Sequence, residues 1–324
     1  MKVAVTGATG FVGGALVRAL AAEGHAVVAL ARTTSSREHL AHLDIQWQVG
    51  DLLAPESLRR KFDGVDWLIH AAGMLGEFGV PERAYYQLHV QGTAHVLAEA
   101  EKAGVKRILY VSSPGVLGPI TGVPADETAP LAPSNSYERS KAIAEQMMPV
   151  YVKAGLPIII VRPEFIYGPG DVHVLGLFQA VRDRKFFYID GGKHVCHPTF
   201  IDDAVLGMLL ALHNGNVGEI YHITGLEPVT FREFGEAIAT VLNVPPPKLS
   251  MPKWLALLGA TGFEFIAGLT KGRPPLSRTG VAFFSEDRRF SWRKAQADLG
   301  YSPQFDLLSG VWETVTWYQR NGLL

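Results

Sequence analysis

The sequence predicts an α/β fold, in which a doubly wound parallel sheet carries a smaller, mainly helical C-terminal lobe. Short apolar runs alternate with helical patterns through the first half of the chain. A glycine-rich turn joins the first apolar run to the first helical pattern. After residue 170 the alternation weakens, and helical patterns with turns prevail. Alternating strands and helices are typical of parallel sheets covered by helices on both faces.

Each predicted strand is a short apolar run suited to burial on both faces of a sheet. A helix at 201–212 and a strand at 220–223 extend the same sheet. We therefore expect a sheet domain of residues 1–167 plus 198–224, and a lobe of residues 168–197 plus 225–324. The other predicted strands are residues 3–6, 26–31, 45–49, 67–70, 108–111 and 158–161.

The composition narrows the class of protein. The chain has 324 residues, of which 48% are hydrophobic and 19% charged, enough for a substantial core. Its net charge of −1 gives no electrostatic footprint for nucleic acid. The single cysteine, Cys196, excludes an internal disulfide and agrees with a reducing compartment. Because a core strand begins at once, we expect no signal peptide and a cytoplasmic protein.

The most apolar segment is residues 254–269. It is shorter than a membrane span and contains Glu264, so we expect no spanning helix. A core helix of the lobe is the favoured interpretation. A lid or a shallow membrane contact is the alternative.

The glycine-rich turn predicts a dinucleotide site. Gly7 permits the tight turn out of the strand, Gly10 admits a pyrophosphate, and Gly13 lets the helix pack on the sheet. The helix N-terminus then directs its free N–H groups at the phosphates. The expected contacts of this turn are Gly7, Thr9, Gly10, Phe11, Val12 and Gly13.

Arg32 follows the second strand, where an acidic residue would bind a ribose 2′-hydroxyl. A guanidinium can instead bind a 2′-phosphate in bidentate fashion. The sequence therefore favours NADP(H), with NAD(H) as the alternative if Arg32 is only a solvated loop residue.

Tyr137 and Lys141 are four positions apart on a predicted helix, so both project from one face. At about 5 Å and an effective dielectric near 20, an ammonium stabilises a phenolate by roughly 3 kcal/mol. We therefore expect Lys141 to lower the pKa of Tyr137, which would then exchange a proton with a substrate oxygen.

These motifs, together with Ser112-Ser113, Arg162-Pro163 and the tail 289–303, resemble the extended short-chain dehydrogenase/reductase superfamily, of the NAD-dependent epimerase/dehydratase type. The glycine pattern TGxxGxxG is the one this superfamily uses. The similarity covers nearly the whole chain. It is greatest to the branch of 3β-hydroxysteroid dehydrogenases and sterol-4α-carboxylate 3-dehydrogenases.

The resemblance implies a catalytic set of Ser113, Tyr137 and Lys141, in which Ser113 polarises the substrate oxygen and Lys141 also holds the nicotinamide ribose. Two positions depart from the family pattern, since Glu164 and His89 stand where Asn is usual. His89 would order water near the lysine or merely pack. Asp51 could equally be a helix cap. The further cofactor contacts that the resemblance implies are Asp51, Leu52, Ala71, Ala72, Gly73, Ser112, Tyr137, Pro163, Phe165 and Ile166.

The expected function is hydride transfer between NADP(H) and a hydrophobic ketone or secondary alcohol of steroid, lipid or aromatic type. Apolar residues of 254–266 suggest apolar walls for that substrate. A nucleotide-sugar epimerase or dehydratase with retained NAD is the first alternative, and a non-catalytic NADPH-binding scaffold is the second. Cations for a diphosphate exist at Arg182, Arg184, Lys185, Lys193, Lys271 and Arg273.

Two further expectations concern metals and assembly. His194 and His197 flank Cys196, but without a further ligand cluster we expect no metal. Members of the superfamily often dimerise through the helix that bears the tyrosine and lysine. A homodimer would place Ala142, Ile143 and Met147 at such a seam, unless these side chains pack inside.

Overall fold

The computed structural model describes residues 1–270, 272 and 274–324. In this part of the chain, seven parallel strands form one sheet in the order β11-β6-β5-β4-β1-β2-β3. The chain winds outward from β1 to β3 and then returns to β4, beside β1. The topological switch point, where ligands of such sheets bind, therefore lies between β1 and β4. The strands are β1 (Lys2–Thr6), β2 (Ala26–Ala31), β3 (Gln46–Val49), β4 (Trp67–His70), β5 (Arg107–Val111), β6 (Ile158–Pro163) and β11 (Ile220–Ile223).

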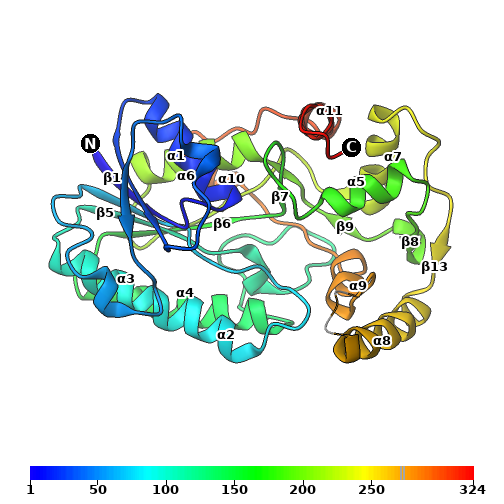
Figure 1. Ribbon diagram of the computed structural model, residues 1–324, viewed down its shortest axis with the longest axis horizontal. Coiled ribbons are helices and arrows are strands. Elements are labelled where there is room, and N and C mark those ends of the chain that lie inside the picture. Colours follow the sequence, from blue (N-terminus) through cyan, green and yellow to red (C-terminus); the bar gives the residue numbers. More distant parts are fainter. Residues whose placement is uncertain (271, 273) are drawn as a thin grey trace.

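Helices cover both faces of the sheet (Figure 1). On one face lie α1 (Phe11–Ala22), α6 (Ile201–Asn214) and α10 (Arg293–Leu299). On the other lie α2 (Glu82–Tyr86), α3 (Gly92–Lys102) and α4 (Ser136–Lys153). Each face has its own apolar core, and all six residues of β6 are buried. The expected α/β fold with a doubly wound parallel sheet is confirmed.

The lobe lies beyond β6, on the right of Figure 1. It contains helices and two short strand pairs, and a third pair, β7 with β10, lies at its junction with the sheet domain, so it is less purely helical than the sequence predicts. The helices are α5 (Leu175–Arg182), α7 (Phe231–Val241), α8 (Lys253–Thr270), α9 (Arg278–Phe284) and α11 (Leu307–Arg320). The strand pairs are β7 (Ile166–Tyr167) with β10 (Thr199–Phe200), β8 (Tyr188–Ile189) with β13 (Ser250–Met251), and β9 (Val195–Cys196) with β12 (Val229–Thr230).

Helix α8 differs from its expected role as a core helix. Its buried face consists of Ala256, Ala260, Glu264 and Ala267, which pack towards α9. Trp254 and Phe265 are 67% and 70% exposed, and Leu258 is similar. Small residues on the inner face bring the helix close to α9, and this turns the large apolar side chains outward. None of the helices in the described ranges combines the length and hydropathy that crossing a bilayer requires.

Of the three α4 residues considered for a dimer seam, two pack inside the protein and one is exposed. Ala142 is buried and Met147 packs against the core beneath α4. Ile143 is exposed. Ala142 and Met147 therefore pack inside, and Ile143 remains on the outer surface of this helix.

Candidate active site

The glycine turn between β1 and α1 forms a cradle at the switch point. Gly7 has a φ of +73°, and the N–H of Gly10 donates to the carbonyl of Gly7 at 2.9 Å. A Cβ added at Gly13 would lie 2.1 Å from the Gly7 oxygen, and one added at Gly7 would lie 2.7 Å from the nitrogen of Ala72. The turn can therefore form only because Gly7 and Gly13 have no side chain.

The first turn of α1 is open to an anion. Its N-cap, Gly10, brings no side chain to the exposed N–H groups, and the first turn carries no acidic residue. Free N–H groups at a helix N-terminus bind phosphate readily. The cradle thus fits a dinucleotide pyrophosphate. Of the neighbouring predicted contacts, Phe11 and Val12 pack against the core, and Thr9 is half-buried.

Ala71, Ala72 and Gly73 follow β4 on the other side of the switch point. The N–H of Ala72 donates to the hydroxyl of Thr6 at 3.3 Å, which ties the end of β4 to the end of β1. Ala71 and Ala72 are half-buried and Gly73 is exposed beside the cradle, and their contact with a cofactor stays a prediction.

Arg32 and Asp51 follow β2 and β3 at the same edge of the sheet. Arg32 is exposed, whereas the nearby Arg37 lies over the ring of Trp47 at 4.9 Å. Asp51 accepts a hydrogen bond from the N–H of Leu53 at 2.9 Å. Asp51 therefore closes a turn at residues 51–53 and does not cap the short helix Pro55–Leu58, whose N-cap is Ala54, so the helix-cap alternative is wrong. Leu52 is buried in the core beneath α3.

Ser113, Tyr137 and Lys141 meet at the carboxyl end of β5. Ser113 accepts from the N–H of Gly115 at 3.1 Å and is hydrogen-bonded to Tyr137. Tyr137 lies in the first turn of α4. Lys141, one turn later, donates from Nζ to the carbonyl of Val111 at 2.6 Å. Its ammonium also lies 5.0 Å from the ring centroid of Tyr110. The structure thus joins Ser113 to Tyr137 and places Lys141 one helical turn away, where its recorded contacts are with Val111 and Tyr110.

The pKa values of this set differ from expectation. Burial raises the pKa of Tyr137 to about 12, although the hydrogen bond from Ser113 lowers it. Burial also lowers the pKa of Lys141 to about 8. The expected lowering of the Tyr137 pKa by Lys141 does not occur in the protein by itself, because desolvation of the phenolate dominates and the Lys141 ammonium is directed to the carbonyl of Val111. Tyr137 therefore holds its proton at neutral pH.

Ser112 faces away from Ser113, into a buried polar network behind Lys141. Its hydroxyl donates to Glu145 at 2.6 Å, and Glu145 also accepts two hydrogen bonds from Arg162. Arg162 in turn lies 3.2 Å from His222. All four residues are buried. The network ties together the ends of β5, β6 and β11.

His89 lies in a π-helical turn, Gln87–Gln91, between α2 and α3. Its Nε2 accepts from the N–H of Met74 at 3.0 Å, so Nδ1 carries the proton and donates to Ser140 at 2.8 Å. Burial lowers the pKa of His89 to about 3. Both nitrogens are therefore engaged, and His89 positions Ser140 and the segment after β4.

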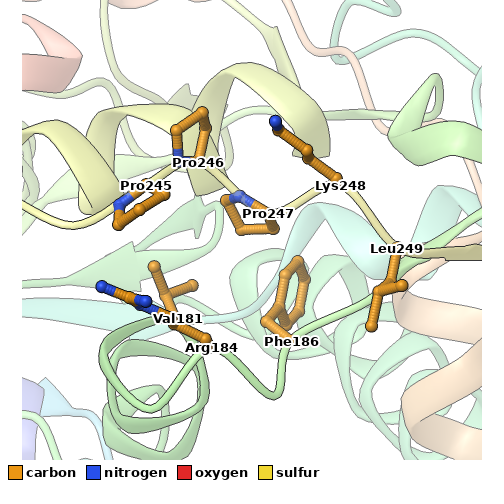
Figure 2. A pocket seen from close by; sticks show the side chains of 8 residues that line it. All are labelled: Val181, Arg184, Phe186, Pro245, Pro246, Pro247, Lys248 and Leu249. Atoms are coloured by element: carbon orange, nitrogen blue, oxygen red, sulfur yellow. The ribbon is translucent and has the colours of Figure 1, made fainter.

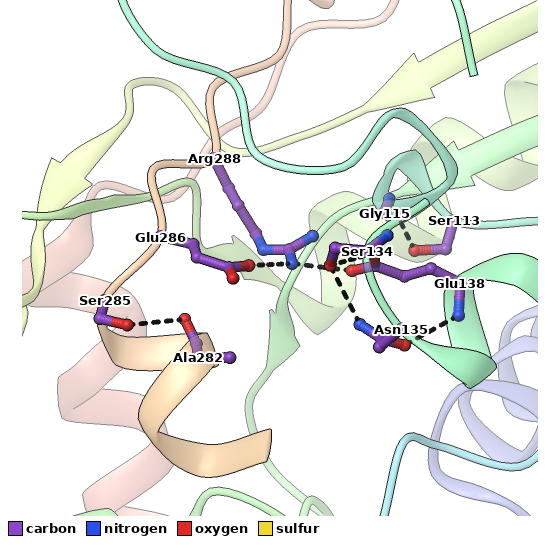
Figure 3. Close-up of polar contacts among 9 residues, drawn as sticks. All are labelled: Ser113, Gly115, Ser134, Asn135, Glu138, Ala282, Ser285, Glu286 and Arg288. Atoms are coloured by element: carbon purple, nitrogen blue, oxygen red, sulfur yellow. Dashed lines mark hydrogen bonds and ion pairs between the residues drawn. The ribbon is translucent and has the colours of Figure 1, made fainter. Parts of the chain in front are cut away.

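A buried cluster of charges beside Tyr137 was missed by sequence reasoning. Arg288 reaches Glu138 at 2.7 Å and Glu286 at 3.2 Å, while Glu138 also accepts from the N–H and hydroxyl of Ser134 (Figure 3). Glu164 is buried among the same charges, and its pKa is raised to about 7 mainly by burial, against the opposing influence of Arg288. Glu138 adjoins Tyr137 in sequence, but Arg288 is 150 residues away, so no spacing could reveal this pair.

Pro163, Phe165 and Ile166 lead from β6 into the lobe. Phe165 has a φ of 27°, and its carbonyl accepts from the N–H of Thr199 at 3.0 Å. Its ring meets Phe283 edge-on, with 5.1 Å between centroids. This contact places the segment at the junction of the sheet and the lobe, while Pro163 stays in register with Ile223 of β11.

A cavity of about 390 Å³ adjoins Tyr137. Glu264 of α8 and Arg278 contribute to its wall, and they pair at 2.6 Å. The outward-facing Trp254, Leu258 and Phe265 do not line this cavity, contrary to the apolar walls expected from them. The other lining residues are Gly76, Glu77, Phe78, Gly79, Val80, Tyr85, Asn135, Ser136 and Thr279.

A second pocket, of about 230 Å³, lies between the end of α5 and the triple-proline segment (Figure 2). Arg184 and Lys248 are its basic residues. Arg184 thus lies in this pocket and not in the cavity beside Tyr137. Lys271 and Arg273, also considered as diphosphate ligands, lie outside the described residues.

Cys196 and the histidines that flank it are engaged separately. His197 is 3.0 Å from the carbonyl of Gly225, and His194 is 3.2 Å from Asp287. The Cys196 thiol donates to the carbonyl of Val229 at 3.6 Å. These contacts account for the three side chains without a shared ligand.

Comparison of the sequence with known proteins identifies a family and several similar enzymes. Residues 3–224 match the model of the NAD dependent epimerase/dehydratase family. The chain is 30% identical to a 4-hydroxy-2-methyl-3-oxo-4-farnesyl-3,4-dihydroquinoline-1-oxide ketoreductase of Stigmatella aurantiaca, over 93% of this chain and 92% of that protein. It is 27% identical to a decarboxylating sterol-4-alpha-carboxylate 3-dehydrogenase of Schizosaccharomyces pombe, over 95% of each.

Solved structures share the same fold. A crystal structure of the dTDP-glucose 4,6-dehydratase DesIV from Streptomyces venezuelae, with NAD and TYD bound, superposes with a TM-score of 0.81. The sequences are 27% identical, and the alignment covers 99% of this chain and 98% of that one. The proteins similar to this chain thus include a ketoreductase, a sterol-carboxylate dehydrogenase and a nucleotide-sugar dehydratase.

Proposed function

Because this chain belongs to the NAD-dependent epimerase/dehydratase family, and is an oxidoreductase of the extended short-chain type, we propose that it reduces a hydrophobic, uncharged ketone with NADPH. The observation that carries the proposal is the meeting of Ser113, Tyr137 and Lys141 beside the glycine cradle.

The cradle and the ends of the neighbouring strands would hold the cofactor. The N–H groups after Gly10 would bind the pyrophosphate, and the backbone of Ala72 would lie against it. Arg32, exposed after β2 and without a carboxylate at that position, would bind a 2′-phosphate. When bound, NADPH supplies the hydride that a ketone carbon accepts.

Tyr137 would act as the proton donor. With a pKa near 12 it keeps its proton at neutral pH, as a group that protonates a carbonyl oxygen during reduction must. Ser113 would donate a hydrogen bond to the same oxygen and stabilise its developing charge. Lys141 is buried and donates to the carbonyl of Val111. Its ammonium would bind the ribose and would stabilise the Tyr137 phenolate left after proton transfer.

The charges around Tyr137 support an uncharged substrate. Near the catalytic cavity, in the described part of the chain, the guanidinium group of Arg288 is buried and paired with Glu138. The more exposed guanidinium groups of Arg278 and Arg139 are paired with Glu264 and Glu82. A diphosphate or carboxylate substrate would have to displace these carboxylates or enter beside them, and unpaired buried charges are costly. This favours a ketone reductase over a nucleotide-sugar enzyme.

The two parts of the chain would have different roles in binding. Residues 1–167 plus 198–224 would bind the dinucleotide, and residues 168–197 plus 225–324 would shape the substrate site. Within the second group, α10 packs against α6 and β11 of the sheet domain. This helix would therefore anchor the lobe and not line its site. A homodimer remains part of the proposal, with the exposed Ile143 of α4 as a candidate contact.

The test uses purified protein with NADPH and two substrate sets, apolar ketones and UDP- or dTDP-sugars, while nicotinamide absorbance is recorded. We expect net NADPH oxidation with ketones, and little with NADH. Conversion of a nucleotide sugar without net absorbance change would contradict the proposal in favour of an epimerase. Binding of NADPH without any turnover would instead indicate a scaffold.

A further inference from the structure

Three potential metal ligands converge at the edge of the sheet opposite the catalytic set. Glu23 follows α1, His25 precedes β2, and His213 lies in the last turn of α6. Their ligand atoms all lie within 4.8 Å of one another. This edge carries the amino ends of the strands, whereas Tyr137 lies beyond their carboxyl ends.

The backbone between α1 and β2 sets two of these side chains side by side. Gly24 adopts a φ of +78°, and the N–H of His25 donates to the carbonyl of Leu20 at 3.0 Å. The short turn thus presents Glu23 and His25 to the same point, and α6 brings His213 to it from a distant part of the sequence.

The indole of Trp67, at the start of β4, fixes both imidazoles. Its ring meets His213 edge-on at 5.1 Å between centroids, and it lies 5.7 Å from His25. The His25 side chain is only 12% exposed. Packing of this kind limits the rotation of the imidazoles and lowers the entropy lost when a ligand binds.

The spacing of the atoms suits a small cation. Nε2 of His25 and Nε2 of His213 lie 3.2 and 3.4 Å from the same oxygen of Glu23. Zinc bonds to imidazole and carboxylate are about 2.0–2.2 Å, which separates tetrahedral ligands by roughly 3.3–3.5 Å. The two observed separations therefore need little adjustment to enclose an ion.

We propose that Glu23, His25 and His213 form a Zn²⁺ site that braces the turn between α1 and β2 against α6. Two imidazoles and one carboxylate are a ligand set that zinc accepts, with water in the fourth position. Nitrogen-rich sites favour Zn²⁺, Ni²⁺ and Cu²⁺ over Mg²⁺ and Ca²⁺. The site stabilises the fold and takes no part in hydride transfer. It also revises the expectation that the protein binds no metal.

The experiment measures binding of Zn²⁺, and of Co²⁺ as a spectroscopic probe, to the full chain after treatment with a chelator. We expect one ion per chain and the visible absorption that four-coordinate Co²⁺ gives. The melting temperature should rise with Zn²⁺ but not with Mg²⁺. His213→Ala should weaken Zn²⁺ binding at least about tenfold. His42→Ala, which removes an exposed histidine outside the cluster, should not.

Each variant is compared with and without metal, so a change in intrinsic stability does not obscure the result. Glu23→Gln, which keeps the shape and removes the charge, provides a second variant if His213→Ala folds poorly. Wild-type affinity weaker than about 1 mM would overturn the proposal. Equal affinity in wild type and in either cluster variant would overturn it as well, because the ion would then bind elsewhere.

Discussion

Replacing Gly13 with alanine tests the glycine cradle most sharply. The new Cβ would lie 2.1 Å from the Gly7 oxygen, 2.6 Å from the Gly7 carbonyl carbon and 3.1 Å from the Cα of Ala8. All three are backbone atoms, so no side chain can rotate away. Because non-bonded atoms settle about 3.5–4.0 Å apart, the helix must retreat from the turn by roughly 1 Å.

This displacement of α1 from the glycine turn should affect both stability and cofactor binding. Overpacking of a well-packed site costs about 1–3 kcal/mol. A shift of about 1 Å in the N–H groups that face a pyrophosphate should also weaken NADPH binding by tenfold or more, which corresponds to about 1.4 kcal/mol. Titration of NADPH fluorescence and thermal unfolding measure the two effects separately.

Gly14→Ala is the matched control one position later. There the nearest atom to the new Cβ is Nε2 of His39, at 3.0 Å, the far end of a side chain that can move. Alanine in a helix interior is favoured over glycine by about 1 kcal/mol. We therefore expect unchanged NADPH affinity and equal or higher stability. NADPH affinity in the Gly13→Ala variant equal to that of wild type would refute the assigned cradle.

Three further predictions follow from other positions. Arg32→Asp should shift preference from NADPH towards NADH, measured as the ratio of kcat/KM values, and an unchanged ratio would rule out the 2′-phosphate contact. Burial raises the pKa of Glu164 from 4.5 to about 7, so the folded state binds the extra proton and stability should fall as pH rises through this range. Glu164→Gln should flatten that decline in melting temperature, and an unaltered profile would contradict the assignment. Glu145→Gln leaves Arg162 buried without its ion pair and should cost about 3–5 kcal/mol in urea unfolding. The exposed Glu82→Gln should cost less than about 1 kcal/mol, and equal losses would contradict the argument.

Local patterns were enough to predict the sheet. Strands at 26–31, 67–70 and 220–223 have the predicted bounds, and the others differ by a residue or two at an end. Apolar runs bounded by turns mark such strands, because a parallel sheet buries both faces of each. The glycine turn and the spacing of Tyr137 and Lys141 were readable for the same reason, since each depends on neighbours in sequence.

Features set by distant contacts were not predictable. The pKa of Tyr137 depends on its burial against distant side chains such as Tyr85 and His89, and the pairing of Arg288 with Glu138 joins residues 150 positions apart. The orientation of α8 was also missed, because its apolar residues surround the helix and no single stripe marks the buried side. Alanines, not the large side chains, proved to face α9.

The central claim, that Tyr137 delivers the proton in hydride transfer from NADPH, is tested most directly by Tyr137→Phe, with Tyr86→Phe, at an exposed tyrosine outside the cavity lining, as the control. The account predicts that Tyr137→Phe lowers ketone turnover by roughly 10²–10⁴-fold while NADPH affinity stays nearly unchanged, and that the control retains activity. Turnover by the phenylalanine variant at the wild-type rate would contradict it.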